Sequence, residues 1–127
     1  MHIDHVAIWT NNLVEEKELY IKYFGGTAGK KYDNYLKKFS SYFISFSGGA
    51  RIELMKKDNL DSAGQRVATG IAHFAISAGN RSEVDRITEM IGADGHKILS
   101  NPRMTGDGYY ESVVLDPEGN VVEIVCG

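Results

Sequence analysis

An internal repeat constrains this chain more than any other feature of its sequence. Residues 5–8 read His-Val-Ala-Ile, and residues 73–76 read His-Phe-Ala-Ile. In each half a polar stretch follows, then a segment whose apolar residues have helical spacing, then segments that alternate like strands. Helices are expected over about 13–24 and 81–91, and the clearest strands over 41–47, 51–55, 109–115 and 121–125. This matching order predicts two copies of one β-α-β-β-β module.

Short signals mark the ends of the two helices. Gly25-Gly26 follow the last apolar position of the first helical segment. In the second half, Ser82 and Asp85 have the spacing of a capping box, and Gly92 is expected to end the helix. Each helix is therefore predicted to be about three turns long.

The remaining segments are connections and weaker strands. Two short strands are expected near 27–32 and 96–99, and a tight turn at 116–120, where Pro and Gly separate two strand-like runs. Residues 101–108 are rich in turn formers and are predicted to form either a mobile loop over the site or a plain connection between strands. The modules are expected at about 1–57 and 71–127 of a single domain, joined by a polar linker of about 58–70.

Composition excludes several classes of protein. The net charge is −3 and the isoelectric point is about 5.8, whereas nucleic-acid binders usually carry a basic face. No apolar run approaches the roughly 20 residues of a membrane span, and the first residues lack the cationic start and apolar stretch of a secretory signal. Cys126 is the only cysteine, which fits a reducing compartment. We therefore expect a cytoplasmic protein that binds neither nucleic acid nor a membrane.

Four residues recur in register with the repeat. Glu53 follows His5 by 48 residues, and Glu123 follows His73 by 50. Each histidine is expected in the first strand of its half, and each glutamate in the last strand, between apolar neighbours. Side chains alternate between the two faces of a strand. The large aliphatic residues are therefore expected to pack against the helices, which leaves the histidines and glutamates on the other face.

Taken singly, each of the four is most simply a hydrogen-bonded or solvated strand residue. Taken together, at equivalent positions of a duplication, they have the chemistry of a metal site. A carboxylate on an enclosed sheet face is costly unless it is paired or bound to a metal. Two imidazoles and two carboxylates suit a divalent transition metal that keeps positions open for water. We predict a metal site with the ligands His5, Glu53, His73 and Glu123.

Four segments carry a resemblance to a known family, namely 5–8, 50–54, 70–76 and 116–124. They resemble the vicinal oxygen chelate superfamily, which includes glyoxalase I, bleomycin-resistance proteins, extradiol dioxygenases and methylmalonyl-CoA epimerase. The resemblance covers essentially the whole chain. It implies an α+β fold in which two tandem βαβββ modules form a cupped mixed sheet with the helices outside.

Within that superfamily the ligand order His-Glu-His-Glu resembles glyoxalase I, or lactoylglutathione lyase. The resemblance implies Ni, Co or Zn as the metal, a hemithioacetal or related vicinal-oxygen substrate, and a homodimer with sites shared between subunits. Such a metal stabilises the charge of an enediolate. By position, Glu123 matches the acid that moves the substrate proton, and Glu53 is its counterpart.

Two positions depart from short bacterial glyoxalase I sequences. Trp9 stands where these typically have an Arg that grips the glutathione carboxylate, and Lys57 stands where they tend to have Asn. The sequence therefore leaves open whether glutathione is the thiol from which the substrate is formed. Substrate contacts are expected from Trp9, Arg51, Arg103 and Tyr109. Two alternatives remain: another enzyme of the superfamily, such as an epimerase or an antibiotic thiol transferase, and a non-catalytic drug- or ligand-binding protein.

Overall fold

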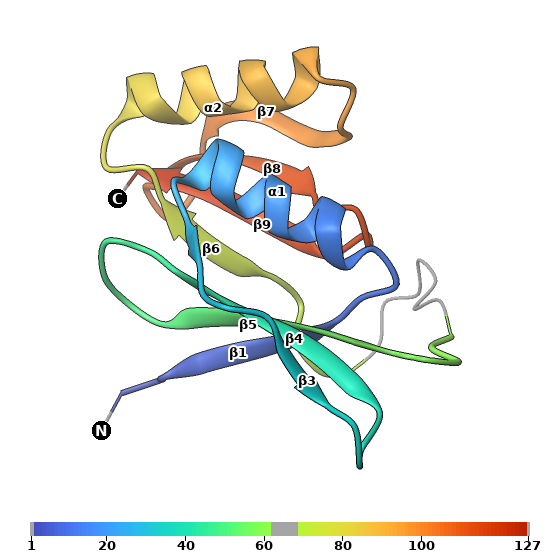
Figure 1. The fold of residues 1–127 in the computed structure, drawn as a ribbon. Helices are drawn as coiled ribbons and strands as arrows, with labels where there is room; N and C mark the ends of the chain where they lie inside the picture. Colours follow the sequence, from blue (N-terminus) through green and yellow to red (C-terminus); the bar gives the residue numbers. More distant parts are fainter. Residues whose placement is uncertain (1, 62–68, 127) are drawn as a thin grey trace. The chain divides into compact units, whose positions relative to one another are not determined.

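In the computed structural model, residues 2–61 and 69–126 are described. They fall in two compact units, Met1–Ser62 and Ala63–Gly127. Each unit holds one helix and one sheet of mixed strands (Figure 1), which confirms the prediction of two tandem βαβββ modules in an α+β chain. Of the predicted linker, residues 62–68 lie outside the described residues. No helix in the described ranges is long and apolar enough to cross a membrane.

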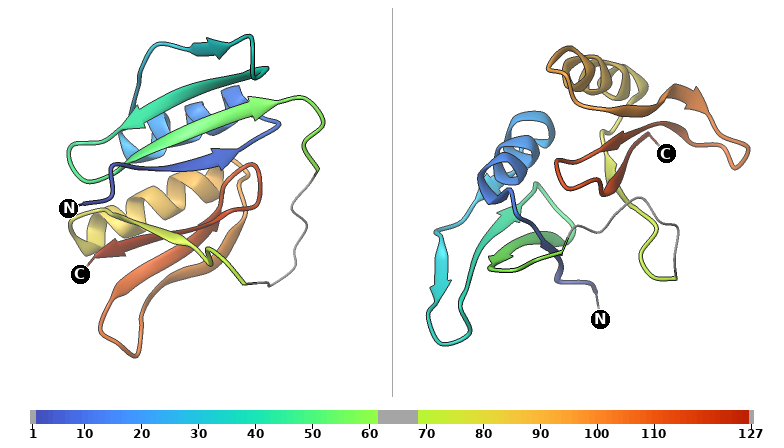
Figure 2. Two further views of the ribbon diagram at one scale, coloured as in Figure 1. Left: turned by 90° about the horizontal axis from the view of Figure 1, so that it is seen from below. Right: turned by 90° about the vertical axis from the view of Figure 1, so that its right-hand side faces the viewer.

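The first unit contains a five-stranded sheet and one helix. Its strands follow the order β1-β5-β4-β2, and β3 also pairs with β4. β1 runs parallel to β5, and Figure 2 (left) shows the two side by side; the other pairs are antiparallel. The single weak strand predicted near 27–32 is two short strands. The elements are β1 (His5–Trp9), α1 (Leu13–Phe24), β2 (Thr27–Ala28), β3 (Tyr32–Asn34), β4 (Phe39–Ser45) and β5 (Arg51–Lys57).

Helix α1 has its predicted bounds because two glycines end it. Gly25 takes a left-handed backbone with a φ of 65°, which an L side chain would strain. Gly26 lies so close to the sheet that a Cβ atom there would come within 2.6 Å of the Ile44 side chain. The helix therefore packs on β4 and β5. The core of this unit includes Leu19, Tyr20, Ile44, Ile52 and Leu54.

The second unit contains a four-stranded sheet with the order β6-β9-β8-β7. Helix α2 contacts β7, β8 and β9, so it covers one face of this sheet. β6 runs parallel to β9, and the other pairs are antiparallel. The elements are β6 (Phe74–Ser77), α2 (Arg81–Ala93), β7 (Ile98–Met104), β8 (Tyr110–Leu115) and β9 (Val121–Cys126). The core includes Val84, Ile87, Ile91, Val114, Val122 and Ile124.

The predicted capping box of α2 is wrong by two residues. The N-cap is Asn80, whose side-chain oxygen accepts a hydrogen bond from the Glu83 backbone N–H at 3.0 Å. The Ser82 hydroxyl donates to that same oxygen at 2.6 Å, so it supports the cap without forming it. Asp85 instead accepts a hydrogen bond from the Tyr110 hydroxyl. An Asn at the N-cap satisfies a helix N–H as well as a Ser does.

The predicted end of α2 is also wrong, because the helix runs two residues beyond the expected 81–91, to Ala93. Gly92 continues the helix, and it lies so near β7 that a Cβ atom added to it would be 3.6 Å from the Ile98 side chain. Gly95 supplies the left-handed backbone, with a φ of 87°, that leads out of the helix. Gly92 therefore provides a close approach between helix and strand, not a stop signal.

The predicted loop 101–108 is half strand. β7 continues through Pro102 to Met104, and only the turn from Thr105 to Tyr109 is irregular. Proline is tolerated here because β7 lies at the edge of its sheet, where a missing N–H can face away from the neighbouring strand. The pairing with β8 shifts register on both sides of Ser100. The prediction failed for residues 101–104 because an edge strand can contain the same turn-forming residues as a loop.

Candidate metal site

The first unit brings His5 and Glu53 together. In the parallel β1–β5 pair, Ala7 lies opposite Glu53, which puts the His5 and Glu53 side chains on the same face, diagonally across the two strands. The His5 Nε2 atom is 3.8 Å from the Glu53 Oε1 atom. Ile52 and Leu54, on either side of Glu53, are buried on the α1 face. The predicted alternation of β5 is confirmed.

The second unit repeats this arrangement with His73 and Glu123. Ala75 on β6 lies opposite Glu123 on β9, and the His73 Nε2 atom is 3.4 Å from the Glu123 Oε2 atom. His73 lies one residue before β6, not inside it as predicted. Val122 and Ile124 are buried on the α2 face. The same pair of functional groups therefore forms at the same place in both units.

The nitrogen–oxygen distance within each pair can be compared with that of a hydrogen bond and with that of two ligands on one metal ion. Both distances exceed the roughly 2.7–3.2 Å of an N–H···O hydrogen bond. Two ligand atoms that each lie about 2.1 Å from one zinc-sized ion are about 3.0–3.4 Å apart at octahedral to tetrahedral angles. The second pair has this spacing, whereas the first pair, at 3.8 Å, is wider. The His73–Glu123 pair therefore has the spacing expected of two ligands on one ion.

The Glu53 and Glu123 carboxylates lie where a bound cation would offset the free-energy cost of withdrawing them from water. The Glu53 and Glu123 side chains are only 14% and 20% exposed. A carboxylate withdrawn from water to this extent needs a compensating charge. Within the described residues, no group of three or more His, Cys, Asp or Glu side chains has the arrangement of a metal site. A centre with all four ligands therefore stays a prediction.

Asp4 is a site residue that sequence reasoning missed. Its Oδ1 atom accepts a hydrogen bond from His5 Nδ1 at 2.8 Å and another from the Arg51 guanidinium. A carboxylate only accepts hydrogen bonds, so this contact assigns the proton to Nδ1 and leaves Nε2 free to bind a metal. The His5 hydrogen bond, then that of Arg51, lower the pKa of Asp4. The signal in the sequence was an acid directly before the first histidine.

Arg51 therefore has a structural partner as well as a place on the face of Glu53. Its guanidinium is paired with Asp4, and its central carbon lies 4.4 Å from the Phe43 ring centroid. The Phe43 ring in turn meets the His5 ring edge-on, with centroids 5.2 Å apart. These contacts fix the orientation of His5 from two sides.

Glu111 is the second residue that sequence reasoning missed. It lies on β8 directly opposite Arg103, and diagonally across the β8–β9 pair from Glu123 on the same face of the sheet. Burial, followed by the charge of Glu123, raises the pKa of Glu111, and Arg103 offsets part of this. Two neighbouring carboxyl groups can share one proton. The sequence carries no local signal for this neighbour, because it depends on the β8–β9 register, in which Glu111 lies opposite Val125 and Glu123 opposite Val113.

The other expected contacts are distributed over both units. Trp9 is 46% exposed, lies on the face of His5, and has the Lys57 ammonium 4.7 Å from its ring centroid. Arg103 donates a hydrogen bond to the Ser100 hydroxyl. Tyr109 is exposed in the β7–β8 turn, where its backbone N–H donates to Thr105. The two positions that depart from glyoxalase I sequences, Trp9 and Lys57, are thus in contact.

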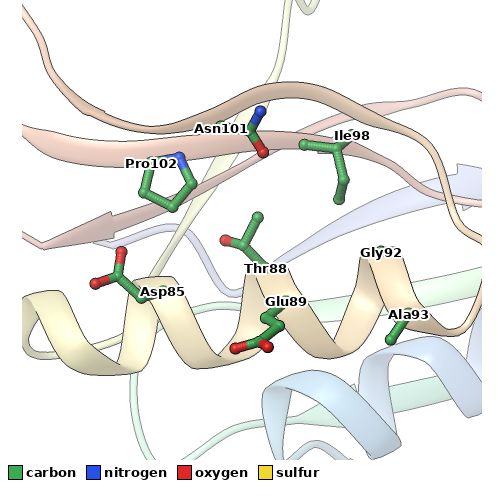
Figure 3. A pocket seen from close by; sticks show the side chains of 8 residues that line it. All are labelled: Asp85, Thr88, Glu89, Gly92, Ala93, Ile98, Asn101 and Pro102. Carbon is green, nitrogen blue, oxygen red and sulfur yellow. The ribbon is translucent and has the colours of Figure 1, made fainter.

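A hollow of about 490 Å³ lies elsewhere, between α2 and β7 (Figure 3). Asp85, Thr88 and Glu89 line it from the helix, and Ile98 and Pro102 line it from the strand. α2 covers the sheet face opposite to that of Glu123, so this hollow is separate from the His73–Glu123 pair. Its lining contains no histidine or cysteine that would hold a transition metal.

Comparison with known proteins identifies the family. Residues 2–124 match the family described as Glyoxalase/Bleomycin resistance protein/Dioxygenase superfamily, and the chain belongs to it. The chain is 32% identical over 74 residues to the uncharacterized protein YqjT of Bacillus subtilis (strain 168), a match that covers 56% of this chain and 58% of that protein.

Two solved structures illustrate the shared fold. Glyoxalase I from Zea mays superposes with a TM-score of 0.82 at 24% identity, covering 99% of this chain and 44% of that one. The chain therefore spans less than half the length of the maize enzyme. A glyoxylase/bleomycin resistance protein/dioxygenase domain from Frankia sp. EAN1pec has a TM-score of 0.82 at 15% identity, covering 100% of this chain and 98% of that one.

Proposed function

We propose that this protein is a metal-dependent isomerase of the glyoxalase I type, which acts on a hemithioacetal or a related substrate with two neighbouring oxygens. The observation that carries this proposal is the pair of His–Glu couples, His5–Glu53 and His73–Glu123, at equivalent places in two units. Their nitrogen–oxygen distances of 3.8 and 3.4 Å are both longer than a hydrogen bond. Family membership supports it.

In this proposal the four residues together hold one Ni, Co or Zn ion. Imidazole nitrogen and carboxylate oxygen are ligands that all three metals accept. When bound, the metal supplies Lewis-acid stabilisation of negative charge on the substrate oxygens. Asp4 holds His5 in the tautomer that ligation needs. We further propose a homodimer, in the cytoplasm, with sites shared between subunits.

Glu123 is the proposed base. It takes a proton from one substrate carbon and returns it to the neighbouring carbon, as general acid–base catalysis requires. Glu111 is its diagonal neighbour on the same sheet face and can hold a proton in exchange, whereas β4, the strand next to Glu53, contains no glutamate. This difference favours Glu123 over Glu53 for the proton transfer and leaves Glu53 chiefly a ligand.

The experiment compares Glu123→Gln with the wild type after both are loaded with metal. Hemithioacetals of methylglyoxal with a panel of thiols serve as substrates. We expect Glu123→Gln to lower kcat by about 10²–10⁴-fold, the usual effect of removing a general base. Glu18→Gln, an exposed change on α1, is the matched control and should leave kcat unchanged. Absence of turnover with every thiol adduct would contradict the proposed function.

A further inference from the structure

The sheet of the first unit carries a cluster of aromatic side chains beside the His5–Glu53 pair. The register places four residues in one row across four strands, because Trp9 lies opposite Met55, Met55 opposite Ser41, and Ser41 opposite Tyr32. In the next row Lys57 lies opposite Phe39. All of these residues have the parity of Glu53, so they share its face of the sheet.

Three rings of these rows pack on one another. The Trp9 and Phe39 centroids are 6.4 Å apart with the rings nearly perpendicular, and the Tyr32 and Phe39 centroids are 5.9 Å apart. We call Trp9, Tyr32 and Phe39 the aromatic cluster. Trp9 and Tyr32 still expose about half of their surface, 46% and 53%. Exposed aromatic surface gathered in one place is typical of a binding site.

Ser41 lies in the same row and supplies an independent sign of a ligand. The residue is 1% exposed, yet its hydroxyl oxygen has no hydrogen-bond partner among the residues that the structure describes. A buried hydroxyl without a partner is costly, and native proteins seldom keep one without a reason. A polar atom of a ligand that enters between the rings would satisfy it.

Lys57 gives the cluster a charge. Its ammonium lies 4.7 Å from the Trp9 ring centroid and forms no ion pair with a described residue. An ammonium above an indole ring keeps donors that point away from the ring, and these can bind an acid group. Arg51, the other cation on this face of β5, is already engaged by Asp4. The cluster therefore combines flat apolar surface with one available positive charge.

We propose that the aromatic cluster, Ser41 and Lys57 form a subsite for a ligand with an aromatic or similarly flat apolar group and a terminal acid group, such as a carboxylate. Lys57 is four residues from Glu53, which is about 13 Å along an extended strand. The acid group thus binds at about that distance from the metal-binding pair. That this ligand is the tail of the substrate rests on the proposed function; binding itself does not.

The first experiment measures binding to metal-free protein. Trp9 is the only tryptophan of the chain, so its fluorescence reports directly on the subsite. The probe is 4-phenylbutyrate, compared with 4-phenylbutylamine, which has the opposite charge, and with butyrate, which has no ring. We expect saturable binding of 4-phenylbutyrate with a change in Trp9 emission, and at least tenfold weaker binding of the other two.

Variants then test the two parts of the subsite. Lys57→Ala should weaken binding of 4-phenylbutyrate about tenfold or more, as expected when a charged hydrogen-bond donor is lost. Lys57→Glu should reverse the preference in favour of the amine. Lys56→Ala is the matched control, because Lys56 is also exposed but has the opposite parity on β5. It should leave binding unchanged.

Three results would overturn this proposal: equal binding of the acid and the amine, equal weakening by Lys56→Ala and Lys57→Ala, or binding that leaves Trp9 emission unchanged. A separate assay links the subsite to turnover. The hemithioacetals of 4-(mercaptomethyl)benzoate and benzyl mercaptan should differ in kcat/KM, and Lys57→Ala should abolish the difference. If neither thiol adduct reacts but 4-phenylbutyrate still binds as described, the proposed function fails and the subsite stands.

Discussion

Asp4→Ala tests whether His5 is oriented for metal binding. In the wild type, Asp4 accepts the hydrogen bond of His5 Nδ1 at 2.8 Å, which directs Nε2 toward Glu53. Without this acceptor, the ring can rotate or carry its proton on Nε2, and either change removes a ligand. Loss of such an outer partner typically lowers metal affinity by about 10–100-fold. We expect that loss for Co²⁺ and Zn²⁺.

The assay is competition for the metal with a chromophoric chelator, performed near neutral pH. Asp4 also holds Arg51, so Arg51→Ala is measured in parallel; it removes the cation but leaves the Asp4–His5 hydrogen bond. Asp33→Ala is the matched acidic control, because the Asp33 carboxylate pairs with Lys31 and accepts a hydrogen bond from Ser40. Arg51→Ala and Asp33→Ala should bind metal within about threefold of the wild type.

The pH dependence of the Asp4 effect has a definite sign. Because the pKa of Asp4 is lowered from 3.8 in the folded protein, its hydrogen bonds persist at and above that pH and are lost as the pH falls through the folded value. The Asp4→Ala defect should therefore be complete at neutral pH. Unchanged metal affinity in Asp4→Ala, or an equal loss in Asp33→Ala, would refute the assigned role.

Two further predictions concern stability. The pKa of Glu111 is raised from 4.5 by burial and by Glu123, so its ionisation destabilises metal-free protein as the pH rises above that value. Glu111→Gln should raise Tm at neutral pH, with the gain disappearing below pH 4.5 in thermal melts; a pH-independent gain would contradict this cause. Gly26→Ala should destabilise the protein by about 1–3 kcal/mol, because the new Cβ meets Ile44 at 2.6 Å and the Tyr20 carbonyl at 2.9 Å. Gly48→Ala, which meets nothing within 4 Å, should change the free energy of unfolding by less than about 0.5 kcal/mol in urea titrations.

The sequence predicts most of the fold because its signals are local and occur twice. Both helices and the central strands follow from the spacing of apolar residues, and the two-residue period of β5 and β9 puts Glu53 and Glu123 opposite the core. The His–Glu pairs follow from the repeat, because it places the same two residue types at equivalent positions of the parallel strand pairs β1–β5 and β6–β9.

What the sequence does not predict depends on pairing between strands. Glu111 meets Glu123 only because β8 and β9 pair in one register, and Asp4 reaches Arg51 only because β1 lies parallel to β5. Pro102 is typical of a loop, and its place within a strand is explained only by the position of β7 at the edge of its sheet. Such contacts join distant segments, and a single sequence carries no local signal for them.

The central claim is that both His–Glu pairs bind one ion together, and its most direct test is a titration of metal-free protein with Co²⁺. The account predicts one tightly bound ion per chain, and predicts that His5→Ala and His73→Ala each abolish tight binding although the two residues belong to different units. Two ions per chain, or a His5→Ala protein that still binds Co²⁺ as the wild type does, would contradict it.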